Sequence, residues 1–285
     1  MKKYILILGL ILSFNAQAGE LPSCGENCTY SYTQNGTDQD GNITYTLTIK
    51  PIDSEQTAKV QAYDRYGATT KENPVYAPWR RERVTSVVIE KGVTDIGSHS
   101  FEDITITEVS LPEGLKTIGA EAFHNTSLVR VDLPSSLTSI GDFAFCIWSL
   151  QEVSDIPEEM TRLAHQVFSN TKIKNWVIPE GVKNIAPTAF GSKIKQYSSS
   201  SIENLYCNET IADQCDAAVQ WKRDLGNEVN VITYKKDGDK IFYKNKWYNN
   251  ANDILSGDYI KKRIYTIDEA NAVAGKTNRI SIRYR

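Results

Sequence analysis

Three histidines are the residues in this sequence most suited to acid, base or metal chemistry. Each lies close to a different phenylalanine of a regular series, so His99, His124 and His165 are expected on different turns of the chain rather than in one cleft. A histidine satisfied at the surface or within a turn is therefore the favoured interpretation. No set of histidines and cysteines has the spacing of a zinc site, so we predict no metal, no cofactor and no catalytic residue.

Two acidic segments carry part of a calcium-binding pattern. These are residues 38–42 and residues 237–239. The position that should hold the closing glutamate is Leu47 in the first and Lys244 in the second. Both segments are therefore predicted to be hairpin turns.

The N-terminus has the pattern of a secretory signal peptide. Lys2 and Lys3 precede an apolar run from Tyr4 to Phe14, and Ala16-Gln17-Ala18 supplies small residues before a cleavage site. The run is shorter than the ~20 residues that cross a bilayer. We expect residues 1–18 to be removed and the remainder to be exported without membrane insertion, to the cell surface, the medium or the periplasm.

Export places the cysteines where disulfides persist. Two local pairs are expected, Cys24 with Cys28 and Cys207 with Cys215, although four cysteines allow three pairings. Cys146 is then the odd one. Its place directly after a phenylalanine of the regular series predicts a buried free thiol.

These residues are organised by a repeat of about 22 residues in the middle of the chain. Two independent series of apolar residues share this spacing. The first is Phe101, Phe123, Phe145, Phe168 and Phe190, and the second is Val87, Val109, Val131, Val153, Trp176 and Tyr197. A fixed period of this length predicts a repeat solenoid over residues 84–200, mainly β with short helical or turn return segments.

One repeat shows how each coil should fold. Because side chains alternate along a strand, Val109 and Leu111 are expected in the core, with Glu108 and Ser110 on the opposite face. Gly119 is expected to allow a tight bend in the return segment. One coil cannot bury its own apolar side, so the fold depends on stacking.

The pattern V-x-L-P-x-x-L-x-x-I-G-x-x-A-F resembles the BspA-type leucine-rich repeats of bacterial surface proteins. Upstream, Cys24-Gly25-Glu26-Asn27, the stretch Ile43 to Ile49 and Ala77-Pro78-Trp79 are similar to the module that opens such arrays. The resemblance implies an adhesive or protein-binding surface protein with no catalytic residues.

The sequence departs from this pattern at two places. An extra residue at Ser154-Asp155 predicts a β-bulge. After Tyr197, residues 198–201 abandon the repeat, so the array is expected to end there.

Both ends of a stacked array need caps. Residues 19–83 are predicted to form a β-rich cap, with a hairpin around Asp40-Gly41 and Trp79 covering the first coil. Residues 201–285 are predicted to form a small α+β unit. It would contain a helix near Ala217-Ala218, a hairpin at Asp237-Gly238, a second helix over residues 267–274 and a final strand over residues 279–285.

The exposed strand face is the surface that solenoids commonly use for binding. We expect it to be concave, with two outward residues from each coil. These are Ser86, Val88, Glu108, Ser110, Arg130, Asp132, Glu152, Ser154, Asn175 and Val177. A mixed polar row suits a broad contact with a protein better than a ligand pocket, so a host or cell-surface protein is the predicted partner.

Charge suggests an alternative function for the C-terminal unit. Residues 19–215 hold 16 Lys and Arg against 26 Asp and Glu, whereas residues 216–285 hold 14 against 9. A basic and aromatic tail could dock an envelope-associated structural module on cell-wall glycan. Its residues would be Lys235, Lys236, Lys244, Lys246, Trp247 and Tyr248. An exported protein seldom meets nucleic acid, so no nucleic-acid partner is expected.

Overall fold

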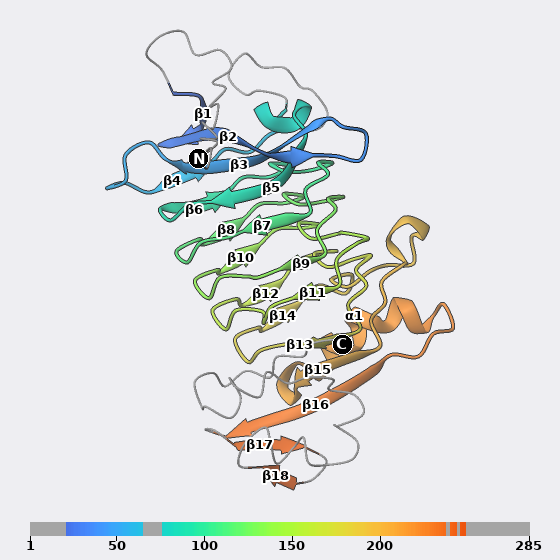
Figure 1. Ribbon diagram of the computed structural model, residues 1–285. Coiled ribbons are helices and arrows are strands. Elements are labelled where there is room, and N and C mark those ends of the chain that lie inside the picture. Colours follow the sequence, from blue (N-terminus) through green and yellow to red (C-terminus); the bar gives the residue numbers. More distant parts are fainter. Residues whose placement is uncertain (1–20, 65–75, 238–239, 244–245, 249–285) are drawn as a thin grey trace, which may run out of the picture.

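The chain folds into stacked coils with two short strands in each, as Figure 1 shows. In this computed structural model the described residues are 21–64, 76–237, 240–243 and 246–248, and side chains are described as far as residue 234. The first ladder consists of β5 (Val84–Ile89), β7 (Glu108–Ser110), β9 (Arg130–Val131), β11 (Glu152–Val153) and β13 (Asn175–Val177). The second ladder consists of β6 (Val93–Ile96), β8 (Thr117–Ile118), β10 (Ser139–Ile140), β12 (Arg162–Leu163) and β14 (Asn184–Ile185).

Where strands of neighbouring coils pair, they pair in parallel, with equivalent repeat positions side by side. Ser86 lies opposite Glu108 in the first ladder, and Asp95 lies opposite Thr117 in the second. This register follows from the period, because coils of equal length bring each position beside its copy in the next coil. The predicted mainly-β repeat solenoid is confirmed.

A column of aromatic rings runs through the core. Trp79 and the five repeat phenylalanines are fully buried, and successive ring centroids lie between 5.1 and 6.5 Å apart. The column provides the apolar burial that a single coil lacks, and each ring is worth more than its area because offset stacking adds to it.

Gly119 serves close packing rather than a special bend. It does not have a positive φ, and a Cβ at this position would lie within 3.0 Å of the Ser98 backbone in the preceding coil. Only glycine allows the two coils to approach this closely. Glycine is therefore needed at position 119 for close packing against the preceding coil, and not for the tight bend that the sequence suggested.

The N-terminal module extends both ladders. It contributes β1 (Ser23–Glu26), β2 (Cys28–Thr37), β3 (Ile43–Pro51) and β4 (Ala58–Val60) to a nine-stranded sheet that also includes strands of the first three coils. β3 pairs in parallel with β5, and β4 pairs in parallel with β6. The expected β-rich cap is confirmed, since it pairs with the first strand of each ladder.

Local contacts hold this cap on the first coil. The Cys24–Cys28 disulfide joins β1 to β2. Trp79, in η1 (Pro78–Arg81), stacks on Phe101 and donates from Nε1 to the carbonyl oxygen of Ser100 at 2.8 Å. The predicted Cys24–Cys28 disulfide and the predicted position of Trp79 over the first coil are both confirmed.

Residues 38–42 form the predicted turn between β2 and β3. The Asp38 carboxylate accepts backbone N–H groups from Asp40 at 3.0 Å and from Asn42 at 2.9 Å. Arg83 lies 2.8 Å from the same carboxylate, which is therefore committed to holding the turn.

The first ladder continues beyond the fifth coil. β15 (Asn204–Asn208) pairs in parallel with β13, and β16 (Asn230–Asp237) pairs in parallel with β15. Leu205 therefore occupies the place beside Trp176 that the sequence series gives to Tyr197. The prediction for Tyr197 was wrong because η2 (Lys195–Tyr197) is inserted before the chain returns to the ladder.

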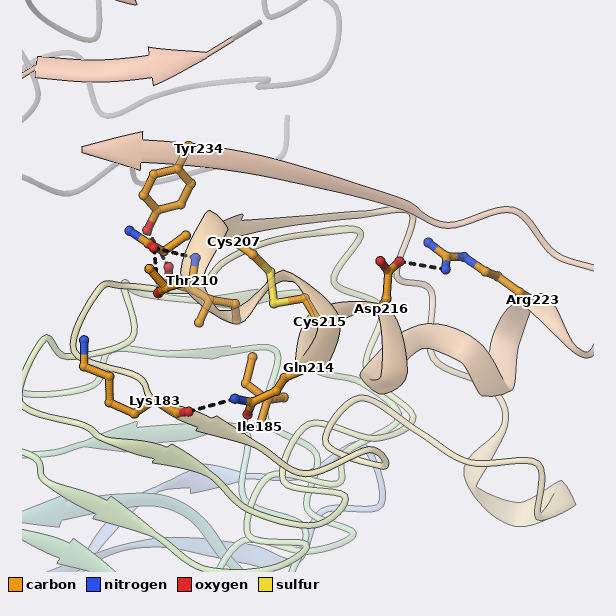
Figure 2. The surroundings of a disulfide bond; sticks show 11 residues. Lys183, Ile185, Cys207, Thr210, Gln214, Cys215, Asp216, Arg223 and Tyr234 are labelled. Carbon is orange, nitrogen blue, oxygen red and sulfur yellow. Dashed lines mark hydrogen bonds and ion pairs between the residues drawn. A yellow bond between two sulfur atoms is a disulfide. The ribbon is translucent and has the colours of Figure 1, made fainter. Parts of the chain in front are cut away.

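A helix closes the second ladder at its C-terminal end. α1 (Ala212–Arg223) contains the predicted Ala217-Ala218 helix and is joined to β15 by the Cys207–Cys215 disulfide. As Figure 2 shows, Gln214 points from this helix toward β14. Its side-chain amide accepts from the Ile185 N–H at 2.8 Å and donates to the Lys183 carbonyl at 3.0 Å, replacing the next strand of the ladder.

The remaining predictions for the ends of the chain are tested only in part. β16 pairs antiparallel with β17 (Lys240–Tyr243), which pairs with β18 (Lys246–Tyr248), in agreement with the hairpin at residue 238. The signal peptide, the helix over 267–274 and the strand over 279–285 lie outside the described residues. In the part of the chain that is described, no helix has the length and apolar character needed to cross a membrane.

Candidate functional site

The strand face consists of the ten outward residues predicted from the first ladder, and the structure places them in one row from β5 to β13. Exposure varies along the row. Glu108, Ser110, Arg130 and Asp132 are exposed, whereas Ser86, Val88, Glu152, Ser154 and Val177 are partly buried. The exposed centre of the row therefore lies on β7 and β9.

Ion pairs order the centre of the strand face. Arg130 binds the Asp132 carboxylate through Nη2 at 2.8 Å and the Glu152 carboxylate of the next strand through Nη1 at 2.7 Å. Asp132, followed by Glu152, raises the pKa of Arg130. Of the described contacts of Arg130, none reaches Glu108, so the predicted ladder of three charges is a network of Arg130, Asp132 and Glu152.

Asn175 is the member of the row whose predicted exposure was wrong. It is 5% exposed, because β15 covers the edge of β13 that the sequence analysis left open. The Asn204 amide donates to the Asn175 side-chain oxygen at 2.6 Å, and Asn230 donates to Asn204 at 2.9 Å. These three asparagines form a ladder that ties the C-terminal strands to the last coil.

The first ladder is interrupted at two places among the described residues, between β7 and β9 and between β11 and β13. Among the described residues, β11 pairs with β9 and β13 pairs with β15, but β11 and β13 do not pair with each other. A small hollow opens at this second place, between residues 151–156 and 173–177. The ladder breaks after the extra residue at Ser154-Asp155, and the pairing of β9 with β11 before it shows no bulge.

Sequence reasoning did not identify the hollow as part of the site. The available signal was the coil spacing of 23, which occurs at this one position of the series. The hollow includes Glu152, Ser154, Asn175 and Val177 of the strand face in its lining. It gives the row a local depression at its C-terminal half.

The histidines do not form a catalytic arrangement with a nucleophile. His165 is exposed, and its Nδ1 lies 2.9 Å from the Thr188 hydroxyl. His99 and His124, expected on separate coils, both contact Glu102. Sequence reasoning missed this convergence because it treated each histidine alone.

Two parallel ladders closed around a phenylalanine column define a leucine-rich repeat solenoid. Residues 79–212 match the family model of the BspA type leucine rich repeat region, in six copies. This region of the chain belongs to the BspA-type leucine-rich repeat family. The sixth copy agrees with β15, which continues the ladder after the fifth coil.

Solved structures of several bacterial leucine-rich repeat proteins are similar to this chain. A leucine-rich repeat protein from Eubacterium ventriosum shares 22% identity over 65% of this chain and 45% of its own, with a TM-score of 0.42. The pneumococcal vaccine antigen PcpA shares 14% identity over 78% and 55%, with a TM-score of 0.37. A leucine rich cell surface protein from Faecalibacterium prausnitzii shares 14% sequence identity over 73% of this chain and 94% of its own length, with a TM-score of 0.23.

The chain thus spans about half the length of the first of these proteins and of the pneumococcal antigen. No curated protein matches it.

Proposed function

We propose that this chain is a non-catalytic binding protein that contacts a protein partner through the strand face. The observation that supports this most is the row itself, with exposed charged groups on β7 and β9 beside the hollow between β11 and β13. The stacked coils place these groups at intervals of about 4.8 Å, which suits a broad surface contact.

The location and biological role belong to the same proposal. The signal-peptide pattern of residues 1–18 and two disulfides support export to an oxidising compartment. The family of the repeat region and the cell-surface protein among the similar structures support a surface-exposed or secreted adhesive role. The partner is then a host-matrix or cell-surface protein.

A matched pair of triple variants tests the binding surface. Glu108→Ala, Arg130→Ala and Glu152→Ala are combined in one chain. The control combines Glu90→Ala, Glu159→Ala and Arg162→Ala, which removes two acids and one base from exposed positions outside the strand face. Binding is measured by surface plasmon resonance against laminin, fibronectin, collagen and a surface-protein extract of neighbouring cells.

We expect the strand-face variant to lose at least tenfold in affinity for any partner found, and the control to bind like the unaltered chain. Equal binding by all three chains, with thermal midpoints unchanged, would refute the strand face as the binding surface.

The glycan-docking alternative is tested with the same chains. The side chains of all six of its residues lie outside the described part of the structure. Sedimentation with isolated cell walls that persists in the strand-face variant and is abolished by Lys235→Ala with Lys236→Ala would support it. A chain cut at residue 200 is unsuited to this test, because the cut removes β15 from its place beside β13.

A further inference from the structure

Glu102 is a nearly fully buried carboxylate that two histidines approach. Its side chain is 1% exposed, and its two oxygens contact different rings. His99 Nδ1 lies 2.7 Å from Oε2, and His124 Nδ1 lies 3.3 Å from Oε1. A second carboxylate completes the group, since Glu121 Oε2 lies 3.5 Å from the same nitrogen of His124.

The repeat brings these four residues together from two coils. His99 and Glu121 each lie two residues before the coil phenylalanine, and Glu102 and His124 each lie one residue after it. The position two before the phenylalanine is left-handed in both coils, with φ of 58° at His99 and 55° at Glu121. The same two repeat positions hold His99 and Glu102 in the first coil and Glu121 and His124 in the second. Stacking of the coils brings these side chains together.

Charge balance favours a cation among these groups. Two carboxylates placed close together repel each other, and a cation between them would relieve that repulsion. A bound divalent ion would neutralise both carboxylates while accepting lone pairs from the imidazoles.

We propose that His99, Glu102 and Glu121 form a binding site for a first-row divalent metal ion such as Zn²⁺, with His124 in contact with both carboxylates. Nitrogen donors distinguish this set from the all-oxygen sites preferred by Ca²⁺ and Mg²⁺. Because the donors come from two neighbouring coils, the ion would join the first coil to the second directly below the N-terminal cap.

The distances fit such a site with small adjustments. Donor atoms about 2.0–2.1 Å from a tetrahedral zinc ion lie about 3.4 Å from one another. One donor atom from each of His99, Glu102 and Glu121 lies within 4.8 Å of the others, and the shortest contact in the group is 2.7 Å. Side-chain rotations of about 1 Å would therefore close the site without moving the ladders.

The surroundings provide both a wall and an entry path. The Phe143 ring packs edge-on against His124 with centroids 6.2 Å apart, which covers one side. On the other side, a hollow lined by Tyr76, Arg80, His99 and Glu102 leads toward the group. The Arg80 guanidinium that faces this hollow is paired with Asp103 at 3.4 Å, so its charge is already offset.

Calorimetric titration of the tag-free full chain with ZnCl₂, after removal of bound metal with EDTA and dialysis, tests this proposal. We expect one ion per chain and no comparable heat with CaCl₂ or MgCl₂. His99→Ala and Glu121→Gln should each weaken Zn²⁺ binding at least tenfold. His165→Ala removes the histidine that contacts Thr188 instead, and should leave the affinity unchanged.

Thermal unfolding separates loss of the site from loss of the fold. Saturating Zn²⁺ should raise the melting midpoint of the unaltered chain and of His165→Ala, but not that of Glu121→Gln. The three midpoints in EDTA should be similar. If the folded unaltered chain binds no Zn²⁺, or if His99→Ala and Glu121→Gln bind it as tightly, the four residues are an ion-pair network and the proposal is wrong.

Discussion

Cys146 is the free cysteine among the described residues, and its side chain is 1% exposed. Burial raises the pKa of its thiol to about 12, although a hydrogen bond from Asn170 opposes the shift. Because the thiolate is the reactive form, this thiol should be inert at neutral pH. We predict no reaction of the native chain with a disulfide reagent at pH 8 within an hour, and one reacting thiol after unfolding in guanidinium. Rapid labelling of the native chain would contradict this account of the core.

Burial of single residues was predictable where it followed the period. The phenylalanines, Cys146 and Trp79 occupy repeat positions or their boundaries, so their places in the core could be inferred from spacing alone. Asn175 could not be placed correctly, because its burial depends on β15, which comes 29 residues later and outside the regular spacing. The approach of His99 and His124 to Glu102 was missed because it requires comparing positions between coils.

Trp79 closes the aromatic column at the element that begins the array. Replacing it with alanine removes the ring over Phe101 and leaves the Ser100 carbonyl without its indole donor. We predict that Trp79→Ala lowers the free energy of unfolding by about 3–5 kcal/mol, as for other buried large-to-small changes. Trp148 is 49% exposed, so Trp148→Ala should change the free energy of unfolding by about 0.5 kcal/mol or less. Urea unfolding followed by circular dichroism measures both, and equal effects would contradict the capping role of Trp79.

Gln214 completes the second ladder from α1. Gln214→Ala removes the hydrogen-bond partner of two backbone groups. These are the N–H of Ile185 in β14 and the carbonyl of Lys183, the residue before β14. Each lost partner costs about 1–3 kcal/mol when the group is buried, and less here because Lys183 is exposed. We predict a loss of about 1–2 kcal/mol. Gln220→Ala, on the exposed side of the same helix, is the matched control and should be near neutral. A variant as stable as this control would show that water replaces the amide.

The elements were predictable to the extent that local chemistry defines them. The period predicted the first strand and the core return segment of each coil, and Asp40-Gly41 predicted the β2–β3 hairpin. The second ladder is less evident, because several of its strands have only two residues. The capping contact of Gln214 has no sequence signature, since it depends on where the helix is docked by the Cys207–Cys215 disulfide.

At the scale of the whole molecule, the array extends further than the repeat pattern indicates. β15 and β16 continue the first ladder, so the C-terminal strands are joined to the solenoid by backbone pairing and by the asparagine ladder. The strand face therefore lies on stacked coils capped at both ends, and strand pairing along it is interrupted between β7 and β9 and between β11 and β13. Because the strand face is already ordered in the free chain, binding a partner costs little conformational entropy at this surface.

Hydrogen–deuterium exchange of the complex, read out by mass spectrometry, tests the central claim most directly. The account predicts that a bound protein partner slows exchange in residues 106–112, 128–133 and 151–156, which form the exposed centre of the strand face and one side of the hollow. Residues 115–118, 137–140 and 160–163 of the second ladder should be unchanged. Protection confined to the second ladder or to residues 204–248, with the strand face unaffected, would contradict it.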